Sequence, residues 1–220
     1  DRCTIVCEVR ADVGIALDGD ADRVIIADEK GKLLDGDQLM AVIAGQMHNR
    51  GQLRGGGLVA THMSNLGLEQ HLDALGLHLC RTRIGDRYVM EYMRKHGYNL
   101  GGEQSGHIIM ADHTTTGDGL VAALKVLSLL AESEKPASEV CRVFTPLPQV
   151  LCNVAYTRSD LLEQEEIRAC IVAAQRQLGK RGRLLVRRSG TEEKIRIMAE
   201  GENESLIRDV VENVAGAIEQ

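Results

Sequence analysis

Aromatic side chains are scarce in this sequence: among 220 residues there is no tryptophan, one phenylalanine and four tyrosines. The core therefore has to be built from aliphatic residues, and a hydrophobic content of 44% is ample for one large domain or two. No hydrophobic run approaches the ~20 residues of a membrane-spanning helix, and no signal-peptide pattern is present. We therefore expect no membrane partner.

Positive charge is also in deficit, with 26 Lys and Arg against 32 Asp and Glu, which gives a net charge of −6. Nucleic acid is not an expected partner, because it selects basic surfaces. The six cysteines form no C-x-x-C pair and lie scattered among apolar residues. This pattern is typical of reduced thiols in the cytosol rather than of a disulfide framework, so the predicted localisation is cytoplasmic.

The only prolines, Pro136, Pro146 and Pro148, lie close together and indicate a domain junction. Before this junction, short apolar runs alternate with amphipathic helical patterns, which predicts βαβ units around a mostly parallel sheet. After it, the order strand, helix, strand, strand, helix predicts a small α+β domain. The predicted fold class is α/β: a mixed or parallel-sheet α/β/α domain, a smaller C-terminal α+β domain, and a remnant of a preceding α/β domain.

The most informative stretch is Asp18-Gly19-Asp20-Ala21-Asp22-Arg23, which lies between two apolar runs typical of buried strands. Crowded carboxylates repel one another unless a hard cation neutralises them, so Asp18, Asp20 and Asp22 are predicted ligands of Mg²⁺. A solvated acidic turn is the alternative. A calcium EF-hand is excluded because Arg23 stands where that motif needs glycine. A phosphatase with Asp18 as nucleophile is disfavoured, because Asp22 stands where that motif has Thr or Val.

A second loop, Gly101-Gly102-Glu103-Gln104-Ser105-Gly106-His107, lies between two predicted strands. Its glycines free the backbone, and Glu103, Ser105 and His107 supply an acceptor, a hydroxyl and an imidazole. Such short polar groups suit a ligand rich in hydroxyls, such as a sugar. The alternative is a polar loop whose histidine packs against its own turn.

Two local features carry expectations of their own. Ser64 follows a histidine at a strand-to-helix step, which suggests a nucleophile pair, but we predict that Ser64 caps a helix beginning at Asn65. The apolar run at residues 13–17 is predicted to be a central strand, and only a few residues precede it. We therefore expect the natural protein to extend further toward its N-terminus.

A third loop, Arg187-Arg188-Ser189-Gly190-Thr191-Glu192, lies in the most basic short segment of an acidic chain. A Ser-Gly-Thr turn can present backbone N–H groups and two hydroxyls to one anion. Arg187 can add a bidentate contact to a phosphate. The sequence therefore predicts phosphate binding here, and a plain β-hairpin with a charged tip is the alternative.

Taken in order, these loops resemble those of the α-D-phosphohexomutase superfamily, and most closely its bacterial branch that acts on glucosamine phosphates. The resemblance covers nearly the whole chain after residue 10. It rests on four motifs: Gly102-Glu103-Gln104-Ser105-Gly106-His107, Thr114-Thr115-Thr116-Gly117-Asp118-Gly119, Gly85-Asp86-Arg87-Tyr88-Val89 and Arg187-Arg188-Ser189-Gly190-Thr191-Glu192.

The resemblance implies part of a four-domain enzyme. Residues 1–34 would be the end of domain 2 with the metal loop, residues 35–144 domain 3 with the sugar loop, and residues 145–220 domain 4 with the phosphate loop. The implied reaction moves a phosphoryl group between the 6- and 1-positions of glucosamine phosphate through a phosphoserine and a bisphosphate, with Mg²⁺ as cofactor. The implied roles are as follows: Arg23 lies beside the phosphoserine, Glu103, Ser105 and His107 contact the phosphorylated hexosamine, and Arg187, Ser189, Gly190 and Thr191 bind phosphate.

The sequence departs from this pattern in three ways, one of which is Glu193 in place of a common proline after the phosphate loop. The serine loop of the superfamily, a Thr-Ala-Ser-His-Asn-Pro-like stretch, is absent, so we expect a missing N-terminal half as a partner and no mutase turnover by this chain alone. Ala21 replaces the usual second glycine of the metal loop, which strains the backbone if its φ is positive. A non-catalytic phosphosugar- and metal-binding half-protein is one alternative function, and a phosphomannomutase or phosphoglucomutase is another. A homodimer is left open.

Overall fold

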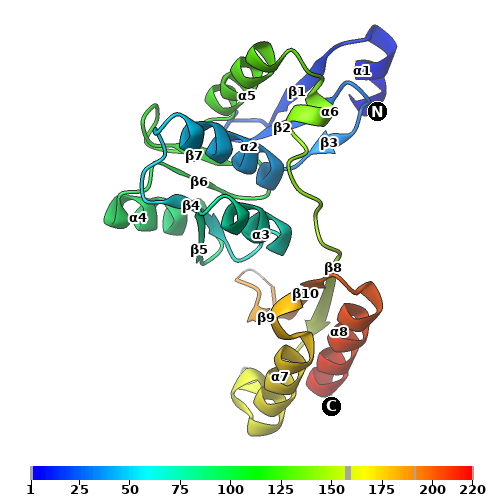
Figure 1. The fold of residues 1–220 in the computed structure, drawn as a ribbon. Helices are drawn as coiled ribbons and strands as arrows, with labels where there is room; N and C mark the ends of the chain where they lie inside the picture. Colours follow the sequence, from blue (N-terminus) through cyan, green and yellow to red (C-terminus); the bar gives the residue numbers. More distant parts are fainter. Residues whose placement is uncertain (1, 157–159, 191, 220) are drawn as a thin grey trace. The chain divides into compact units, whose positions relative to one another are not determined.

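The computed structural model describes residues 2–156, 160–190 and 192–219 (Figure 1). The chain forms two compact units, Asp1–Thr145 and Pro146–Gln220. Each unit has its own hydrophobic core. The division of residues 1–144 at residue 34, between the predicted domains 2 and 3, stays a prediction.

The larger sheet of the first unit has the strand order β5-β4-β6-β7. β4 (Gly57–Thr61) pairs in parallel with β5 (His78–Thr82) on one side and with β6 (Leu100–Gly102) on the other. β7 (Ile108–Met110) is antiparallel to β6. The sheet is therefore mixed, and its three parallel strands end on the same edge, from which the chain leaves in loops.

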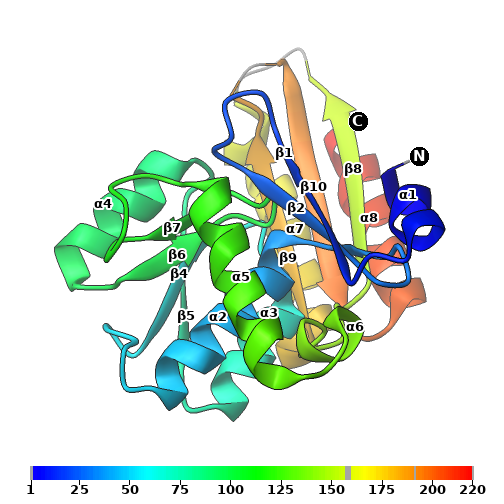
Figure 2. The ribbon, with the colours of Figure 1, turned by 90° about the horizontal axis from the view of Figure 1, so that it is seen from above.

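Helices cover both faces of this sheet (Figure 2). One face carries α2 (Gly36–Asn49), α3 (Leu66–Ala74) and α5 (Gly119–Ser133), and the other carries α4 (Asp86–His96). This arrangement confirms the predicted α/β/α fold class. A short helix, α6 (Ala137–Val140), follows α5.

Successive residues of β4 pack against the helices on alternate faces of the sheet, because side chains of a strand alternate between its faces. Leu58 and Ala60 belong to the main core on the side of α2, and neither is accessible to solvent. Val59 packs on the other side with Val89 and Met93 of α4. A strand that is buried on both faces reads as a continuous apolar run, as predicted for a parallel strand.

A second, antiparallel sheet of the first unit has the order β1-β2-β3, formed by Val13–Leu17, Val24–Asp28 and Leu33–Leu34. Val24 and Ile26 of β2 are buried in the same core as α2 and α5, so the two sheets of the first unit share one hydrophobic core. Within the described residues β1 pairs with β2 alone, which places it at an edge rather than at the predicted centre. The helix α1 (Arg2–Val9) was not predicted.

Side-chain caps fix the starts of three helices. Asp35 caps α2 by accepting from the backbone N–H of Gln38 at 3.0 Å, and Asp118 caps α5 in the same way. Asn65 caps α3 by accepting from the N–H of Gly67 at 2.8 Å. The predicted cap at Ser64 was therefore wrong by one residue, because the extended backbone that a capping residue needs occurs at Asn65, with ψ at 145°.

The second unit is an antiparallel sheet with the order β8-β10-β9, whose strands are Gln149–Ala155, Lys194–Gly201 and Gly182–Arg188. The helices α7 (Glu165–Leu178) and α8 (Glu204–Glu219) contribute apolar side chains to its core. Two single-turn helices, η1 (Leu161–Glu163) and η2 (Gly179–Arg181), flank α7. The predicted order of strands and helices is confirmed.

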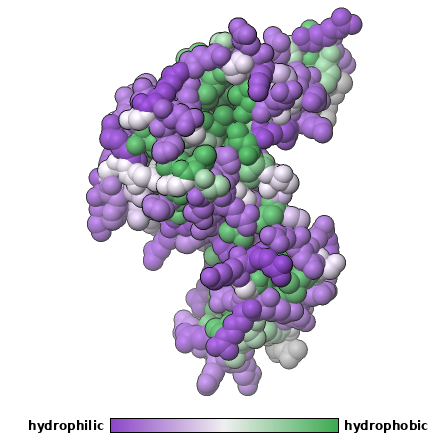
Figure 3. All heavy atoms as spheres, viewed as in Figure 1, coloured by the Kyte–Doolittle hydropathy of each residue, from purple (hydrophilic) through white to green (hydrophobic). Residues whose placement is uncertain are grey.

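Hydrophilic residues cover most of the face shown in Figure 3, and hydrophobic residues show between them. The buried core consists of aliphatic side chains, as the scarcity of aromatics predicts. Within the part of the chain that the structure describes, no helix is both long and apolar enough to cross a membrane.

Candidate active site

The acidic loop joins β1 to β2 and brings its three carboxylates together. One oxygen each from Asp18, Asp20 and Asp22 lies within 4.8 Å of the other two. Asp18 and Asp20 are exposed, whereas Asp22 is half-buried. Strands rather than helices flank the loop, which agrees with the exclusion of an EF-hand. The side chains of the predicted metal ligands are thus assembled in space, and their role stays a prediction.

Arg23 partly neutralises this loop. Its Nε lies 3.9 Å from Asp18 Oδ2 and 3.8 Å from Asp22 Oδ1, and its backbone N–H donates to Asp18 Oδ1 at 3.2 Å. Desolvation by itself would raise the pKa of Asp18, but the Arg23 N–H, the contact with Asp22 and the Arg23 charge together hold that pKa below its ordinary value. Asp18 is therefore ionised and available to a cation at neutral pH.

The backbone of the loop is strained at Ala21. Its φ is +60°, the left-handed region that costs a residue with a Cβ roughly 1–2 kcal/mol. The Ala21 carbonyl accepts a hydrogen bond from the N–H of Gly119, at the start of α5, at 2.9 Å. The positive φ means that Ala21, in place of the usual glycine, strains the backbone of this loop. The hydrogen bond to α5 helps to hold the strained turn.

The sugar loop connects β6 to β7 and lies against the acidic loop. Glu103 Oε1 accepts from the N–H of Gly85 at 3.1 Å, and the Ser105 hydroxyl donates to Glu103 Oε2 at 3.4 Å. The carbonyl of Gly106 accepts from the N–H of Val24, the first residue of β2, at 3.1 Å. The two predicted sugar contacts, Glu103 and Ser105, are thus neighbours at the start of α4.

His107 joins the two loops directly. Its Nδ1 lies 3.1 Å from Asp22 Oδ2, and because an ionised carboxylate only accepts, Nδ1–H is the donor. Nε2 lies 4.0 Å from Asp86 Oδ2, and no described residue forms a hydrogen bond with it. The ring is 3% exposed. The alternative in which this histidine packs against its own turn is therefore wrong.

Gly117 closes the site on the far side of this imidazole. A Cβ at residue 117 would lie 2.2 Å from His107 Nε2 and 2.4 Å from its Cε1. The segment before α5 reaches this position by pairing with β7 through a bridge between Gly117 and Ile109. A glycine is required there for close approach to the His107 ring, which accounts for Gly117 of the Thr-Thr-Thr-Gly-Asp-Gly motif.

Sequence reasoning missed a buried acid, Asp37, in the first turn of α2. Its side chain is inaccessible to solvent, and its Oδ2 accepts from the N–H of Asn65 at 2.8 Å. Desolvation, with a smaller contribution from Asp35, raises the pKa of Asp37 to about 7, against the opposing effects of Asn65, Ser64 and Arg81. An acid in the first turn of a helix is usually exposed, so the sequence carried no signal of this burial.

The phosphate loop belongs to the second unit and connects β9 to β10. The N–H of Ser189 donates to the carbonyl of Lys194 at 2.8 Å, which closes the turn. Gly190 is exposed at its tip, and Thr191 lies outside the described residues. Arg183, the first of the basic residues in this region, pairs with the buried Glu200 and so serves the fold rather than the loop.

Two arginines face each other across the strands that lead into this loop. Arg187 of β9 is paired in register with Arg196 of β10, and like charges directly opposite destabilise a sheet unless an anion lies between them. Burial and then the charge of Arg196 lower the pKa of Arg187 from its ordinary value. Arg196 Nε is buried without a hydrogen-bond partner among the described residues. Arg196 contributes to the basic segment but was not among the predicted phosphate-binding residues. Its Nη2 pairs with Glu192 at 3.3 Å, and its position opposite Arg187 extends the candidate anion site.

The acidic loop also meets the chemical requirements of a magnesium site. All three donors are carboxylate oxygens, the ligands that hard divalent cations prefer. Asp22 Oδ1 is buried and no described residue forms a hydrogen bond with it, and its ion-pair partner Arg23 Nε lies 3.8 Å away, beyond hydrogen-bond distance. The donor set and this unsatisfied oxygen therefore fit Mg²⁺.

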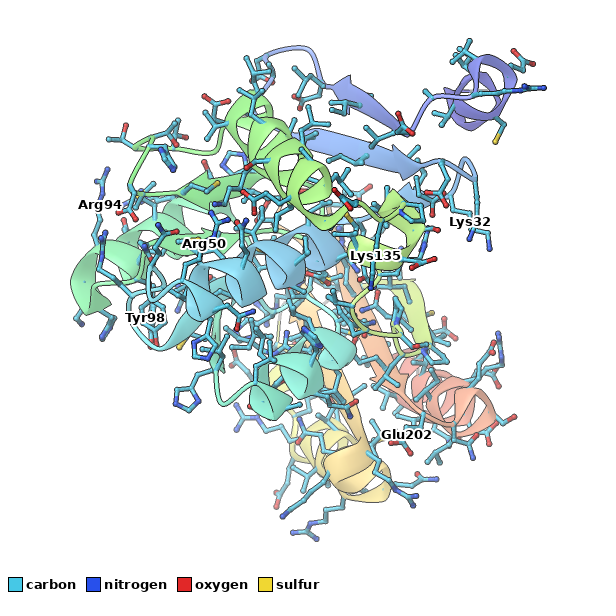
Figure 4. All side chains as sticks on the ribbon, turned by 45° about the horizontal axis from the view of Figure 1, so that its top comes forward. Lys32, Arg50, Arg94, Tyr98, Lys135 and Glu202 are labelled. Carbon is cyan, nitrogen blue, oxygen red and sulfur yellow. The ribbon has the colours of Figure 1, made fainter. Side chains whose placement is uncertain are left out.

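A cavity of about 260 Å³ lies elsewhere in the first unit, at the amino ends of β4 and β6. Arg94 and Tyr98, labelled in Figure 4, line it together with Arg54. Because the acidic and sugar loops lie at the opposite ends of the parallel strands, this cavity is separate from the candidate site.

The chain thus combines an α/β/α unit, which carries adjoining acidic and sugar loops, with a small α+β unit that carries an arginine-bearing loop. Models of the phosphoglucomutase/phosphomannomutase family match the chain in two places: alpha/beta/alpha domain III at residues 35–147 and the C-terminal domain at residues 151–217. The chain belongs to this family, part of the α-D-phosphohexomutase superfamily.

Curated relatives are named phosphoglucosamine mutase. The protein of Parvibaculum lavamentivorans is 56% identical over 217 residues, which are 99% of this chain and 48% of that protein. The protein of Azorhizobium caulinodans is 60% identical over 213 residues, 97% of this chain and 48% of that protein. The chain thus spans about half the length of the curated relatives it matches.

Solved structures show the same fold at low sequence identity. A phosphoglucomutase/phosphomannomutase family protein of Burkholderia thailandensis superposes with a TM-score of 0.80 at 18% identity, over 99% of this chain and 48% of that chain. The N-acetylphosphoglucosamine mutase of Aspergillus fumigatus, solved with GlcNAc-6P and magnesium, gives a TM-score of 0.77 at 23% identity, over 93% of this chain and 51% of that chain.

Proposed function

We propose that this chain supplies the metal, sugar and phosphate sites of a phosphoglucosamine mutase. Such an enzyme interconverts glucosamine 6-phosphate and glucosamine 1-phosphate through a phosphoserine and a bisphosphate intermediate. The observation that carries the proposal is the hydrogen bond between His107 and Asp22, which joins the sugar loop to the acidic loop. The names of the relatives support the choice of sugar. The serine would lie in the part of those relatives that this chain does not span.

In this proposal the side chains of the first unit orient the sugar. Glu103 and Ser105 offer a carboxylate and a hydroxyl to the sugar hydroxyls. Asp22 fixes the tautomer of His107 by accepting from Nδ1–H, and so leaves the Nε2 lone pair as a proton acceptor. Mg²⁺ held by Asp18, Asp20 and Asp22 would neutralise charge on the phosphoserine while a sugar hydroxyl attacks it. Arg23 would lie beside the phosphoserine.

The second unit would hold the phosphate that is not reacting. Arg187, Arg196, Ser189 and Gly190 present charged and backbone donors, and Thr191 would add a hydroxyl. The bisphosphate intermediate has to turn round between the two half-reactions, so this site has to accept a phosphate on either end of the sugar. Guanidinium groups and backbone N–H groups suit that task because they recognise charge more than the shape of the attached ring.

The test is an assay of the full natural chain with Mg²⁺ and a catalytic amount of hexose 1,6-bisphosphate. We expect conversion of glucosamine 6-phosphate to the 1-phosphate, followed by ³¹P NMR, at a higher kcat/KM than for glucose or mannose 6-phosphate. Residues 1–220 alone are expected to show no turnover. A preference for glucose or mannose phosphate would assign another hexose-phosphate mutase, and binding without turnover would assign a non-catalytic binding protein.

Replacing Arg187 with Ala is expected to raise KM for the phosphosugar roughly 10- to 100-fold, because a charge-assisted hydrogen bond to phosphate contributes about 1.5–3 kcal/mol. Arg187→Lys should recover only part of the loss, since lysine lacks the bidentate geometry. The matched control is Arg176→Ala on the exposed surface of α7, which removes the same charge from the same unit. Equal effects of the two alanine variants would show that Arg187 acts only through net charge.

A further inference from the structure

The first residues of α2 hold the turn that follows β4. Asp37 is inaccessible to solvent, and its Oδ2 accepts from the N–H of Asn65 at 2.8 Å. Asn65 in turn accepts from the N–H of Gly67 and so starts α3. Asp37 therefore holds the end of the turn at residues 61–65, while the N–H of His62 donates to the carbonyl of Thr82 at its beginning. This turn lies at the carboxyl ends of the parallel strands, the edge at which open α/β sheets bind their ligands.

The same few residues also hold the sugar loop. The N–H of Gly36 donates to the carbonyl of Gln104 at 2.9 Å, and Gln104 Nε2 lies 3.4 Å from Asp35 Oδ2. β4 and β6 are neighbours in the sheet, so consecutive residues of α2 contact the loops that leave two adjacent strands. A shift of the turn at residues 61–65 relative to α2 changes its distance to the sugar loop.

The groups that face Asp37 come from every element packed against it: Asp35 from its own segment, Ser64 and Asn65 from the turn, and Arg81 from β5. Arg81 donates to the Ser64 carbonyl at 2.6 Å and pairs with Glu69 of α3 at 2.9 Å. Arg81 and the Asn65 N–H favour the carboxylate, whereas burial and Asp35 favour the protonated acid. Together these effects give Asp37 a pKa of about 7.

We propose that Asp37 is a positioning residue for phosphosugar binding, which acts through Asn65 to set the turn at residues 61–65 against the sugar loop. The identity of the ligand rests on the proposed function. As a carboxylate, Asp37 makes a charge-assisted hydrogen bond to the Asn65 N–H that is roughly twice as strong as a neutral one. The turn is therefore held more firmly once Asp37 has ionised, with a midpoint at a pKa of about 7.

The test compares Asp37→Asn with the unchanged protein, both as the full natural chain. The asparagine keeps the shape and the acceptor but cannot ionise, so it imitates the protonated acid. We expect the ratio of KM values, variant over unchanged, to rise from about 1 at pH 6 to about 5 at pH 8, with kcat within about twofold. Because both proteins receive the same substrate, titration of its phosphate cancels in the ratio.

The matched control is Asp73→Asn, which removes an exposed carboxylate from α3 and should give a ratio near 1 at both pH values. A second measurement does not depend on activity: the amide NMR shifts of Asn65 and Gly106 should titrate together near pH 7, and neither should do so in Asp37→Asn. A KM ratio independent of pH would overturn the proposal and leave Asp37 a purely structural role.

The proposed function fails separately, if the unchanged protein converts no phosphosugar. The amide titration then decides the positioning role. Movement of Gly106 together with Asn65 supports a coupling between the turn and the sugar loop, and a silent Gly106 overturns it.

Discussion

Replacing Asp20 with Asn is expected to weaken Mg²⁺ binding by more than 100-fold and to lower kcat by a similar factor. Asp20 is exposed, and among the described residues it makes no hydrogen bond or ion pair that its loss would disturb. Loss of a group that merely orients a metal ligand costs 10- to 100-fold in affinity or activity, and loss of a ligand should cost more. The affinity is measured by calorimetric titration of the full natural chain with Mg²⁺.

The same variant is expected to be slightly more stable than the unchanged protein when no metal is present. Removing one of three carboxylates that lie within 4.8 Å of one another relieves their repulsion. The matched control is Asp12→Asn, in the exposed segment before β1, which changes the same charge without altering the cluster. Unchanged Mg²⁺ affinity in Asp20→Asn would leave the loop as the solvated acidic turn that the sequence also allowed.

Local patterns were predictable because they depend on neighbours in sequence. The acidic loop could be read from three aspartates between two apolar runs, and the structure brings their oxygens together. The alternation of strands and helices followed from hydrophobic periodicity. The helix cap was misplaced by one residue because Ser64 and Asn65 are both good capping residues, and the backbone conformation that decides between them depends on the turn after β4.

Contacts across long stretches of sequence were not predictable. His107 and Asp22 are 85 residues apart, and their side chains come within 3.1 Å because the loop between β6 and β7 packs against the start of β2. Arg187 and Arg196 are opposite one another because of the register of β9 and β10. Asp37 gave no sign that it would be buried, since an acid in a first helical turn is usually exposed and stabilises the helix dipole. Pairing register and burial are properties of the whole fold.

Replacing Gly36 with Ala is expected to displace the sugar loop and to raise KM for the phosphosugar by about 10- to 100-fold. A Cβ at this residue would lie 2.2 Å from the carbonyl oxygen of Glu103 and 2.8 Å from the nitrogen of Gly106. Both atoms are backbone, so the loop has to move, and misplacing a binding group by about 1 Å can cost 10²-fold. We also expect a loss of about 3 kcal/mol in unfolding free energy, from overpacking and from the weakened hydrogen bond to Gln104.

Gly45→Ala, in the same helix, is the matched control. A Cβ at residue 45 would meet only Leu75 Cδ1, at 4.0 Å, so the substitution should stabilise the protein by about 0.5–1 kcal/mol and leave KM unchanged. Steady-state kinetics and urea denaturation of the two variants separate a clash with the sugar loop from a general effect of alanine in α2. Equal stability and equal KM for Gly36→Ala and Gly45→Ala would mean that the start of α2 does not hold the sugar loop. In that case the positioning role of Asp37 would fail as well, because it requires both the contact of Asp37 with Asn65 and the contact of Gly36 with the sugar loop.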